Sequence, residues 1–579
     1  MFNSIFKSTK LIISTNVKYG VILCVITLLQ GITPVLQLWI SKFIIDIIAN
    51  HLMLDQGIDK ISNLYLLFFL QMGIFIITPL LTNIQTSINS LFCELLSFHI
   101  KKNICEKATR IELKYFENSE FYDILQNANS ESGSRPLGII SQGFSIIQNG
   151  ITLVGTYVIL ATLNPLLLVI IIVCSVPTYY INRKYGKKNF HLQKKRTSEV
   201  RQRSYFGSLL TSYWHIKEIR LFDLEQYFWN LVEKLFLKYH SESKDLFFRT
   251  FWGKGISILL SELGRMIVLG YIFILAIKRI ITVGDFTMFS GAITTSISRT
   301  QAIFLNFASL YENSLFFDNY FKFLDFPEKQ KEQKIWDEEI KEIEFVEVSF
   351  TYPGSNKKIL NNVNFKISLG DKVALVGENG TGKTTIIKLI CQFYSPDSGK
   401  ILINGQDSAN YLSATIRKKM SVLLQDYGHY HATVKENIFY GNINNHWEFN
   451  QIISSIEKST AKDFIDALPK KFETMLGKLF DEGVELSVGQ WQKLALARTF
   501  FKGASTIILD EPTASIDLRT ENEILNNIKH HTNGILILIS HRQSIFSIVN
   551  KVIEISHGRS FVKSKAAWDI ENHWVERKG

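Results

Sequence analysis

Three long stretches without a charged residue constrain this chain more than any other feature. They are Tyr19–Ser41, Ile61–Cys93 and Pro136–Asn182, the last of which is 47 residues long. A helix needs about 20 mostly apolar residues to cross the roughly 30 Å hydrocarbon core of a bilayer. Because Asn164-Pro165 interrupts the third stretch near its middle, we expect two crossings there, joined by a short turn. The first half of the chain therefore predicts a membrane protein.

Two weaker apolar runs, Gly255–Ile277 and Phe286–Tyr311, raise the expected number of spans to six. Basic residues cluster in two long segments, at about 94–135 and 183–246, which we expect to be cytoplasmic helical extensions. This orientation predicts a multi-pass protein of the cell membrane with both termini in the cytoplasm. The net charge of +11 comes largely from such flanks, and no groove-reading motif accompanies it, so we expect no nucleic acid partner.

Charged residues also lie inside the last two predicted spans, at Glu262, Arg265 and Arg299. A charge at membrane depth usually faces a pathway or a partner. Two explanations stay open: a role in the transport pathway, or a local pair between Glu262 and Arg265, one helical turn apart. The cytoplasmic extensions contain two short amphipathic pieces, Tyr115–Tyr122 and Lys217–Phe222, which we interpret as helices that dock on the second half of the chain.

The second half contains a phosphate-binding loop. The apolar strand Lys372–Val376 runs into a GxxxxGK[ST] motif, and a helical pattern that begins at Thr385 follows it. Glycines in this motif allow backbone N–H groups to approach phosphate, the lysine reaches the β- and γ-phosphates of ATP, and the hydroxyl can bind Mg²⁺. The expected ATP ligands in and beside the loop are Gly377, Asn379, Gly380, Thr381, Gly382, Lys383, Thr384 and Thr385.

Two further apolar strands end in polar residues of the kind that ATP hydrolysis needs. The apolar strand Ser505–Asp510 is followed by Glu511, and the run Ile535–Ile539 leads to His541. An aspartate at this place in a P-loop ATPase belongs to the Mg²⁺ site. We expect Glu511 to polarise the attacking water as general base, and His541 to reach the γ-phosphate at the carboxyl edge of the sheet.

The segment Leu486–Arg498, which begins Leu-Ser-Val-Gly-Gln, resembles the LSGGQ signature of ATP-binding cassette (ABC) transporters. The order of P-loop, signature, Asp-Glu strand end and histidine is similar to the order in that family, and so is the plan of six spans followed by one cassette. The implied fold is an all-α transmembrane domain of the type I exporter kind, fused to an α/β P-loop nucleotide-binding domain. The expected boundaries are 1–325 for the transmembrane domain, 326–344 for a linker and 345–579 for the nucleotide-binding domain.

The resemblance implies further ATP contacts. Tyr352 matches the aromatic residue that stacks on adenine, Gln425 matches the glutamine that senses Mg²⁺ beside Thr384 and Asp510, and Asp517 matches the loop that crosses to a partner cassette. In the family, the signature of one cassette completes the ATP site of another, a role that falls here to Ser487, Gly489 and Gln490. Because this chain has one P-loop and one signature, a dimer is expected, most simply a homodimer.

The residues Gly489–Lys493 and Ala497–Phe501 resemble those of bacterial exporters of lantibiotics and related peptides. This resemblance implies ATP-driven export of a modified peptide or another amphipathic cargo by alternating access. A multidrug or lipid exporter of the same fold, and an ATP-gated channel or sensor, stay open as alternatives. The signature has Val488 in place of its first glycine, and because valine resists positive φ and adds bulk near phosphate, it could slow hydrolysis.

Overall fold

The computed structural model of the chain describes residues 16–54, 61–131, 135–328, 334–443 and 448–569. Both chain ends, and residues 329–333 of the predicted linker, lie outside this description. The chain forms two compact units. Unit 1 comprises residues up to Arg110 together with Ser119–Pro327, and unit 2 comprises Ile111–Asn118 together with the chain from Glu328 onward. The domain boundaries expected from the sequence stay predictions.

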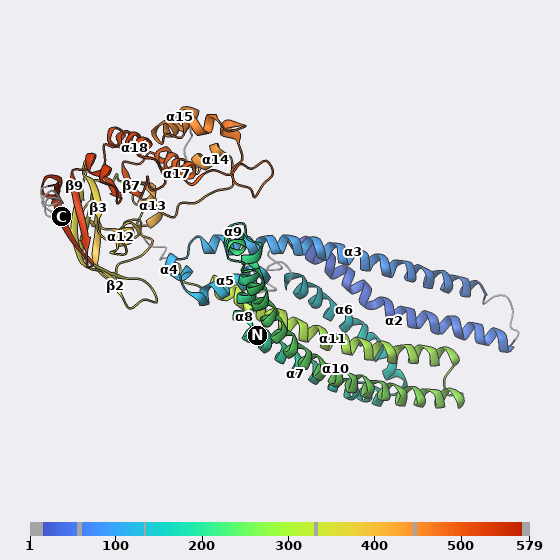
Figure 1. Cartoon of the computed structure of the whole chain (residues 1–579). Helices are drawn as coiled ribbons and strands as arrows, with labels where there is room; N and C mark the ends of the chain where they lie inside the picture. Colours follow the sequence, from blue (N-terminus) through green and yellow to red (C-terminus); the bar gives the residue numbers. More distant parts are fainter. Residues whose placement is uncertain (1–15, 55–60, 132–134, 329–333, 444–447, 570–579) are drawn as a thin grey trace. The chain divides into compact units, whose positions relative to one another are not determined.

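Unit 1 is helical, and six long helices dominate its described part (Figure 1). They are α2 (Val17–Leu54), α3 (Ile61–Ala108), α6 (Arg135–Leu163), α7 (Leu166–Lys195), α10 (Glu225–Ile277) and α11 (Val283–Leu324). Four of these, α2, α3, α6 and α10, are long and apolar enough to cross a membrane, judged on the described residues. The expected spans in α7 and α11 stay predictions. Shorter helices complete the unit: α5 (Ser119–Glu131), α8 (Thr197–Thr211) and α9 (Ile216–Leu221).

The helices of unit 1 begin and end where local chemistry requires. The predicted break at Asn164-Pro165 is confirmed, because α6 ends at Leu163 and α7 begins at Leu166. The Asn164 side chain accepts a hydrogen bond from the backbone N–H of Leu166 at 2.9 Å, which caps the new helix. Helix α6 packs against α2 and α11, and the buried cluster around Ile159, Ile272 and Ile293 joins α6, α7, α10 and α11.

Unit 2 contains two sheets. The larger has the strand order β10-β9-β3-β8-β7-β6, and the smaller antiparallel sheet has the order β2-β1-β4-β5. Strands β3, β6, β7, β8 and β9 pair in parallel, and β7 and β8 are buried along their whole length, as expected of a parallel sheet covered on both faces. The bounds are β1 (Glu342–Thr351), β2 (Lys358–Ser368), β3 (Lys372–Val376), β4 (Ser398–Ile403), β5 (Gln406–Asp407), β6 (Met420–Leu423), β7 (Thr506–Asp510), β8 (Leu536–Ile539), β9 (Lys551–Ser556) and β10 (Arg559–Ser564).

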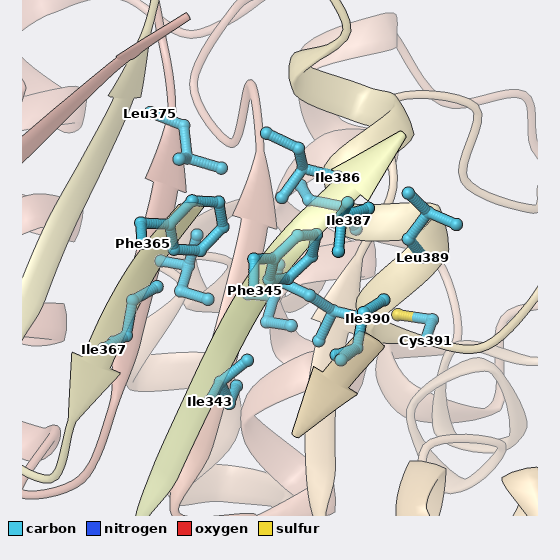
Figure 2. Packing of buried hydrophobic residues seen from close by; sticks show 14 of the residues in the cluster. Ile343, Phe345, Phe365, Ile367, Leu375, Ile386, Ile387, Leu389, Ile390 and Cys391 are labelled. Atoms are coloured by element: carbon cyan, nitrogen blue, oxygen red, sulfur yellow. The ribbon is translucent and has the colours of Figure 1, made fainter. Parts of the chain in front are cut away.

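The main core of unit 2 lies between the two sheets and helix α12 (Lys383–Ile390) (Figure 2). Phe345 and Phe365 stack across β1 and β2 with ring centroids 4.4 Å apart. Ile386, Ile387 and the rest of one face of α12 are buried against them. This packing holds α12 directly behind the carboxyl end of β3. The other helices of unit 2 are α4 (Leu113–Phe116), α13 (Ser413–Lys418), α14 (Val434–Phe439), α15 (Phe449–Lys458), α16 (Lys462–Asp466), α17 (Val488–Lys502) and α18 (Leu518–His531).

Candidate functional site

The loop between β3 and α12 has a backbone that favours glycine at its key positions. Gly377, Gly380 and Gly382 have φ values of 147°, 79° and 106°. A Cβ on Gly377 would lie 2.3 Å from the backbone oxygen of Ile555, and one on Gly382 would lie 2.7 Å from Leu360. The glycines of the motif therefore fold the loop tightly over the end of β3 and the start of α12.

Lys383 is the first residue of α12, and its ammonium group closes this loop. The Nζ atom donates hydrogen bonds to the backbone oxygens of Gly377 at 2.7 Å and Glu378 at 2.8 Å. Burial lowers the pKa of Lys383, and the nearby carboxylates of Glu511 and Asp510 oppose that shift. The loop thus concentrates a positive charge at the N-terminus of a helix, an arrangement suited to binding phosphate.

Asp510 ends strand β7 beside this loop. Its Oδ2 atom accepts a hydrogen bond from the Thr384 hydroxyl at 2.9 Å, while its buried Oδ1 atom has no hydrogen-bond partner among the described residues. Burial raises the pKa of Asp510 to about 6, and the Thr384 hydrogen bond counteracts part of that rise. A carboxylate, a hydroxyl and the side chain of Gln425 in one cleft provide the hard oxygen ligands that Mg²⁺ prefers, so these residues fit the ion.

Glu511 follows Asp510 and contacts two other predicted site residues. Its carboxylate accepts a hydrogen bond from Gln425 Nε2 at 3.2 Å, and its Oε1 atom lies 3.8 Å from His541 Nε2. Glu511 has a φ of 50°, a left-handed conformation that is strained for this residue type and typical of functional sites. A backbone hydrogen bond from its N–H to the Ile539 oxygen, 2.8 Å long, holds it there.

These side chains surround one cleft of about 610 Å³. Tyr352 lines it, and its hydroxyl shares a 3.0 Å hydrogen bond with the hydroxyl of Thr385. Thr381 instead caps the loop by donating to the Glu378 oxygen at 2.9 Å. The predicted site residues that line the cleft are Tyr352, Asn379, Gly380, Gly382, Lys383, Thr384, Thr385, Gln425, Asp510, Glu511 and His541.

The predicted signature residues do not line this cleft. Ser487 is the N-cap of α17, where its hydroxyl accepts from the Gln490 N–H at 3.3 Å and Gln490 Oε1 accepts from the Ser487 N–H at 2.9 Å. Gly489 belongs to the first turn of the same helix. Asp517 is the N-cap of α18 and accepts from the Thr520 N–H at 3.0 Å. Within one chain, Ser487, Gly489, Gln490 and Asp517 therefore lie outside the P-loop cleft.

Val488 corrects one argument drawn from the sequence. It is the first residue of α17 and is not among the residues with positive φ, so valine is not strained at this position and the expected conflict with φ > 0 was wrong. Its side chain is 62% exposed. Gly489 is the position with little space, because a Cβ there would lie 2.8 Å from the Ser515 oxygen.

Two positioning contacts were not predicted from the sequence. The buried Gln492 donates to the backbone oxygen of Glu511 at 2.8 Å and accepts from the Ser515 N–H at 2.9 Å. Arg542 pairs with the fully buried Glu521 and donates to the Ile516 oxygen at 3.0 Å. Both side chains hold the loop between β7 and α18. Gln492 belongs to the signature segment that was recognised in the sequence, but no sequence pattern indicated which backbone atoms its side chain binds.

The first docking segment was predicted only in part. Residues Ile111–Asn118, including α4, belong to unit 2, whereas the chain from Ser119 belongs to unit 1, so the predicted piece Tyr115–Tyr122 crosses a unit boundary. Within unit 2 the Tyr394 hydroxyl donates a hydrogen bond to the Glu117 carboxylate, and Ile111 forms an isolated β-bridge with Glu328. The second predicted piece corresponds to α9 in unit 1, and its docking stays a prediction.

Comparison with known proteins gives matches over most of the chain. Residues 20–298 match the ABC transporter transmembrane region, and residues 360–514 match the ABC transporter family. The subtilin transport ATP-binding protein SpaT of Bacillus subtilis is 29% identical over 95% of this chain and 89% of its own length. The nisin transport ATP-binding protein NisT of Lactococcus lactis is 28% identical over 95% of this chain and 91% of its own length.

Two further similarities concern the ATP-binding part and the fold. An ATP-dependent lipid A-core flippase of Aromatoleum aromaticum is 36% identical, but only over 38% of this chain and 36% of its own length. A solved structure of a bacterial Atm1-family ABC exporter with ATP bound superimposes with a TM-score of 0.83 at 20% identity, over 96% of this chain and 97% of that one.

Proposed function

This chain belongs to the ABC transporters, as an ATPase coupled to transport through a multi-pass membrane region with the type I exporter fold, and from that premise we propose that its cargo is a modified peptide of the lantibiotic kind. The observation that supports this cargo is the similarity to the subtilin and nisin transport proteins across 95% of the chain. The flippase similarity covers 38% of it.

In the proposed site, Lys383 and the N–H groups of the P-loop bind the phosphates of ATP, and Tyr352 stacks on adenine. Thr384, Asp510 and Gln425 would hold Mg²⁺, which neutralises phosphate charge when bound. Glu511 accepts a proton from the attacking water, because its carboxylate is held in the cleft by Gln425. His541, on the other side of the Glu511 carboxylate, orients the γ-phosphate.

The arrangement favours a homodimer. Ser487, Gly489 and Gln490 lie outside the P-loop cleft, so their proposed contact with ATP requires a second cassette. A second copy of this chain supplies both a signature and a P-loop, which makes two complete sites. Closure of these sites by ATP would then drive the alternating access of six spans per chain in the cell membrane. In this orientation both termini and unit 2 are cytoplasmic, where ATP is available.

The test uses the purified full chain reconstituted into inside-out phosphatidylcholine vesicles, with the precursors of subtilin and nisin and a fluorescent lipid A as alternative cargoes. We expect ATP-dependent uptake of a precursor peptide and ATPase stimulation by it. Glu511→Gln should lower turnover by a factor of about 10² to 10⁴ while ATP binding persists, and Lys383→Ala should weaken ATP binding itself.

Other outcomes separate the alternatives. Uptake of lipid A without peptide uptake would replace the peptide cargo by a lipid. Steady ATP turnover that survives in Glu511→Gln would remove Glu511 from the chemistry. ATP binding without cargo movement in the wild type would favour a gated channel or sensor.

A further inference from the structure

Charged side chains within the helical bundle of unit 1 fall into two groups, paired and unpaired. Lys42 of α2 forms a 2.6 Å ion pair with Asp285 of α11, and Glu262 and Arg265 of α10 pair with each other. The local pair that the sequence left open for these two residues is therefore present. Arg299 of α11 differs, because no carboxylate of the described residues forms an ion pair with it.

The partners of Arg299 are neutral. Its Nη1 atom donates to Asn149 Oδ1 on α6 at 3.0 Å, and Asn149, which is 4% exposed, donates to Ser145 Oγ at 3.1 Å. The Arg299 Nε–H is buried and has no acceptor among the described residues. A guanidinium remains protonated at every physiological pH. Within the described residues, the bundle therefore contains a full positive charge that has one N–H group without an acceptor and no carboxylate paired with it.

Arg299 follows the apolar cluster of the bundle along α11. It lies several helical turns beyond Val283, the first residue of α11. The apolar cluster that joins α6, α7, α10 and α11 has Ile297 as its last member on α11, just before Arg299 in the sequence. With the termini in the cytoplasm, as proposed above, Arg299 is on the cytoplasmic side of this apolar layer.

A guanidinium inside the bundle that pairs with no carboxylate of the described residues matches the chemistry of an anionic ligand. Burial of an unpaired charge is unfavourable, and an ionisable residue inside a membrane bundle usually marks a substrate path. Arginine presents parallel N–H groups that a carboxylate accepts in bidentate geometry. We propose that Arg299, oriented by Asn149, binds a carboxylate of the cargo on the cytoplasmic side of the bundle. This inference rests on the proposed peptide export, and it specifies that the exported peptide carries an acidic group.

The experiment measures binding of two peptides to the full chain in phosphatidylcholine nanodiscs. The peptides carry a neutral fluorophore, are acetylated and amidated, and differ only in having glutamate or glutamine at the same positions. We expect the wild type to bind the glutamate peptide at least about tenfold more tightly than the glutamine peptide. Removal of one partner of a buried charge pair typically weakens binding by this much or more. Arg299→Gln should abolish this preference, and Arg299→Lys should keep most of it.

The matched control is the double variant Glu262→Gln/Arg265→Gln. It removes two charges that already neutralise each other, so this variant should keep the preference for the glutamate peptide. Because the readout is a ratio of two affinities, a merely structural role of Arg299 would weaken both peptides alike and leave the ratio unchanged. An unchanged preference in Arg299→Gln would overturn the inference. The thermal midpoint of each variant, measured in the same nanodiscs, confirms that folded protein is compared.

Two further outcomes separate the sources of the effect. If the wild type binds both peptides equally, the carboxylate site is wrong and the proposed peptide export is unaffected. If it binds neither peptide nor any lantibiotic precursor, the proposed peptide cargo fails together with the inference. Nanodiscs that contain phosphatidylglycerol test whether Arg299 binds a lipid phosphate instead of the cargo. If the wild type loses its preference for the glutamate peptide in these nanodiscs, Arg299 is assigned to lipid and the proposed cargo site is overturned.

Discussion

The side-chain amide of Gln492 donates a 2.8 Å hydrogen bond to the backbone oxygen of Glu511. This contact ties the helix that begins with the signature to the proposed general base. The same amide group accepts from the Ser515 N–H, so one buried side chain fixes both ends of a short loop. The signature helix is therefore attached directly to the backbone that carries Glu511.

Replacement of Gln492 by alanine should lower ATP turnover by about tenfold or more. The change leaves a backbone oxygen and a backbone N–H without their partner, which destabilises this loop by roughly 1–3 kcal/mol, and a tenfold rate change corresponds to about 1.4 kcal/mol. ATP affinity should stay close to that of the wild type, because Gln492 does not line the P-loop cleft. Steady-state ATPase assays and equilibrium ATP binding measure the two effects.

Glu523→Gln, on the exposed face of α18, is the control. Turnover in Gln492→Ala equal to that of the wild type would contradict the positioning role.

Tyr394→Phe should uncouple cargo from ATP hydrolysis. The variant removes the hydroxyl that donates to Glu117, a hydrogen bond to a charged group worth about 1.5–3 kcal/mol, and so loosens residues 111–118 from the rest of unit 2. Basal ATPase should persist while stimulation by a precursor peptide falls. Glu117→Gln retains an acceptor oxygen and should behave more like the wild type. Equal loss of stimulation in both variants would show that the contact needs the negative charge of Glu117 as well as the Tyr394 hydroxyl, and unchanged stimulation in Tyr394→Phe would contradict the role of the hydrogen bond.

The same contact predicts a pH response. Burial and the hydrogen bond to Glu117 raise the pKa of Tyr394 above its usual value of about 10. Because the pKa is raised, the folded state stabilises the neutral phenol, which is the form that donates the hydrogen bond. The contribution of this group to stability is complete below pH 10 and is lost only as the pH rises above that value. Stimulation of the ATPase relative to its basal rate should therefore stay constant between pH 7 and pH 9. A decline of that ratio below pH 9 that is absent in Tyr394→Phe would contradict the assigned shift.

Gly489→Ala and Gly503→Ala form a matched pair within α17 and its cap. The added Cβ of the first lies 2.8 Å from the Ser515 oxygen, so it should displace the loop after Glu511 and lower turnover, although alanine favours helix by about 1 kcal/mol. At Gly503, where φ is 68° and the space is open, alanine should cost about 1–2 kcal/mol of stability with little change in turnover. Thermal unfolding and ATPase assays of the purified variants distinguish these effects, and a reversal of the two patterns would refute the steric argument.

Val488→Gly tests whether the valine in the signature is strained. Since Val488 has a helical backbone, glycine should lower the stability of unit 2 by a few tenths of a kcal/mol, according to helix propensity. Strain at this position would give the opposite sign. The thermal midpoint of the full chain, measured beside that of Val488→Ala, decides between the two.

Local chemistry explains which parts of the site were predictable. The spacing of the P-loop motif places Lys383 and Thr384 because the loop is built from consecutive residues, and the strand end places Asp510 beside Thr384. The one-turn spacing of Glu262 and Arg265 likewise suffices for their pair. Each of these relationships follows from the geometry of a single element or of strand ends that meet at the carboxyl edge of one parallel sheet.

The contacts that were missed depend on tertiary structure. Gln492 binds backbone atoms of residues 19 and 23 positions away, and every residue offers such atoms, so no side-chain pattern identifies the partner. Arg542 and Glu521 are ordinary charged residues on separate elements until the fold buries Glu521. The unpaired state of Arg299 is a property of its surroundings and not of its sequence neighbours.

Unit 2 is discontinuous in the chain, and this affects how the protein can be divided or recombined. A fragment that starts at Glu328 lacks the segment Ile111–Asn118 that belongs to the same compact unit, and it would leave the Tyr394 hydroxyl without its acceptor. A chimera that takes its ATPase half from a relative also needs residues 111–118 from that relative, because this segment packs with the ATPase half in one unit. During synthesis, likewise, this segment leaves the ribosome long before the rest of its unit, so unit 2 cannot be completed until the chain beyond Glu328 has been made.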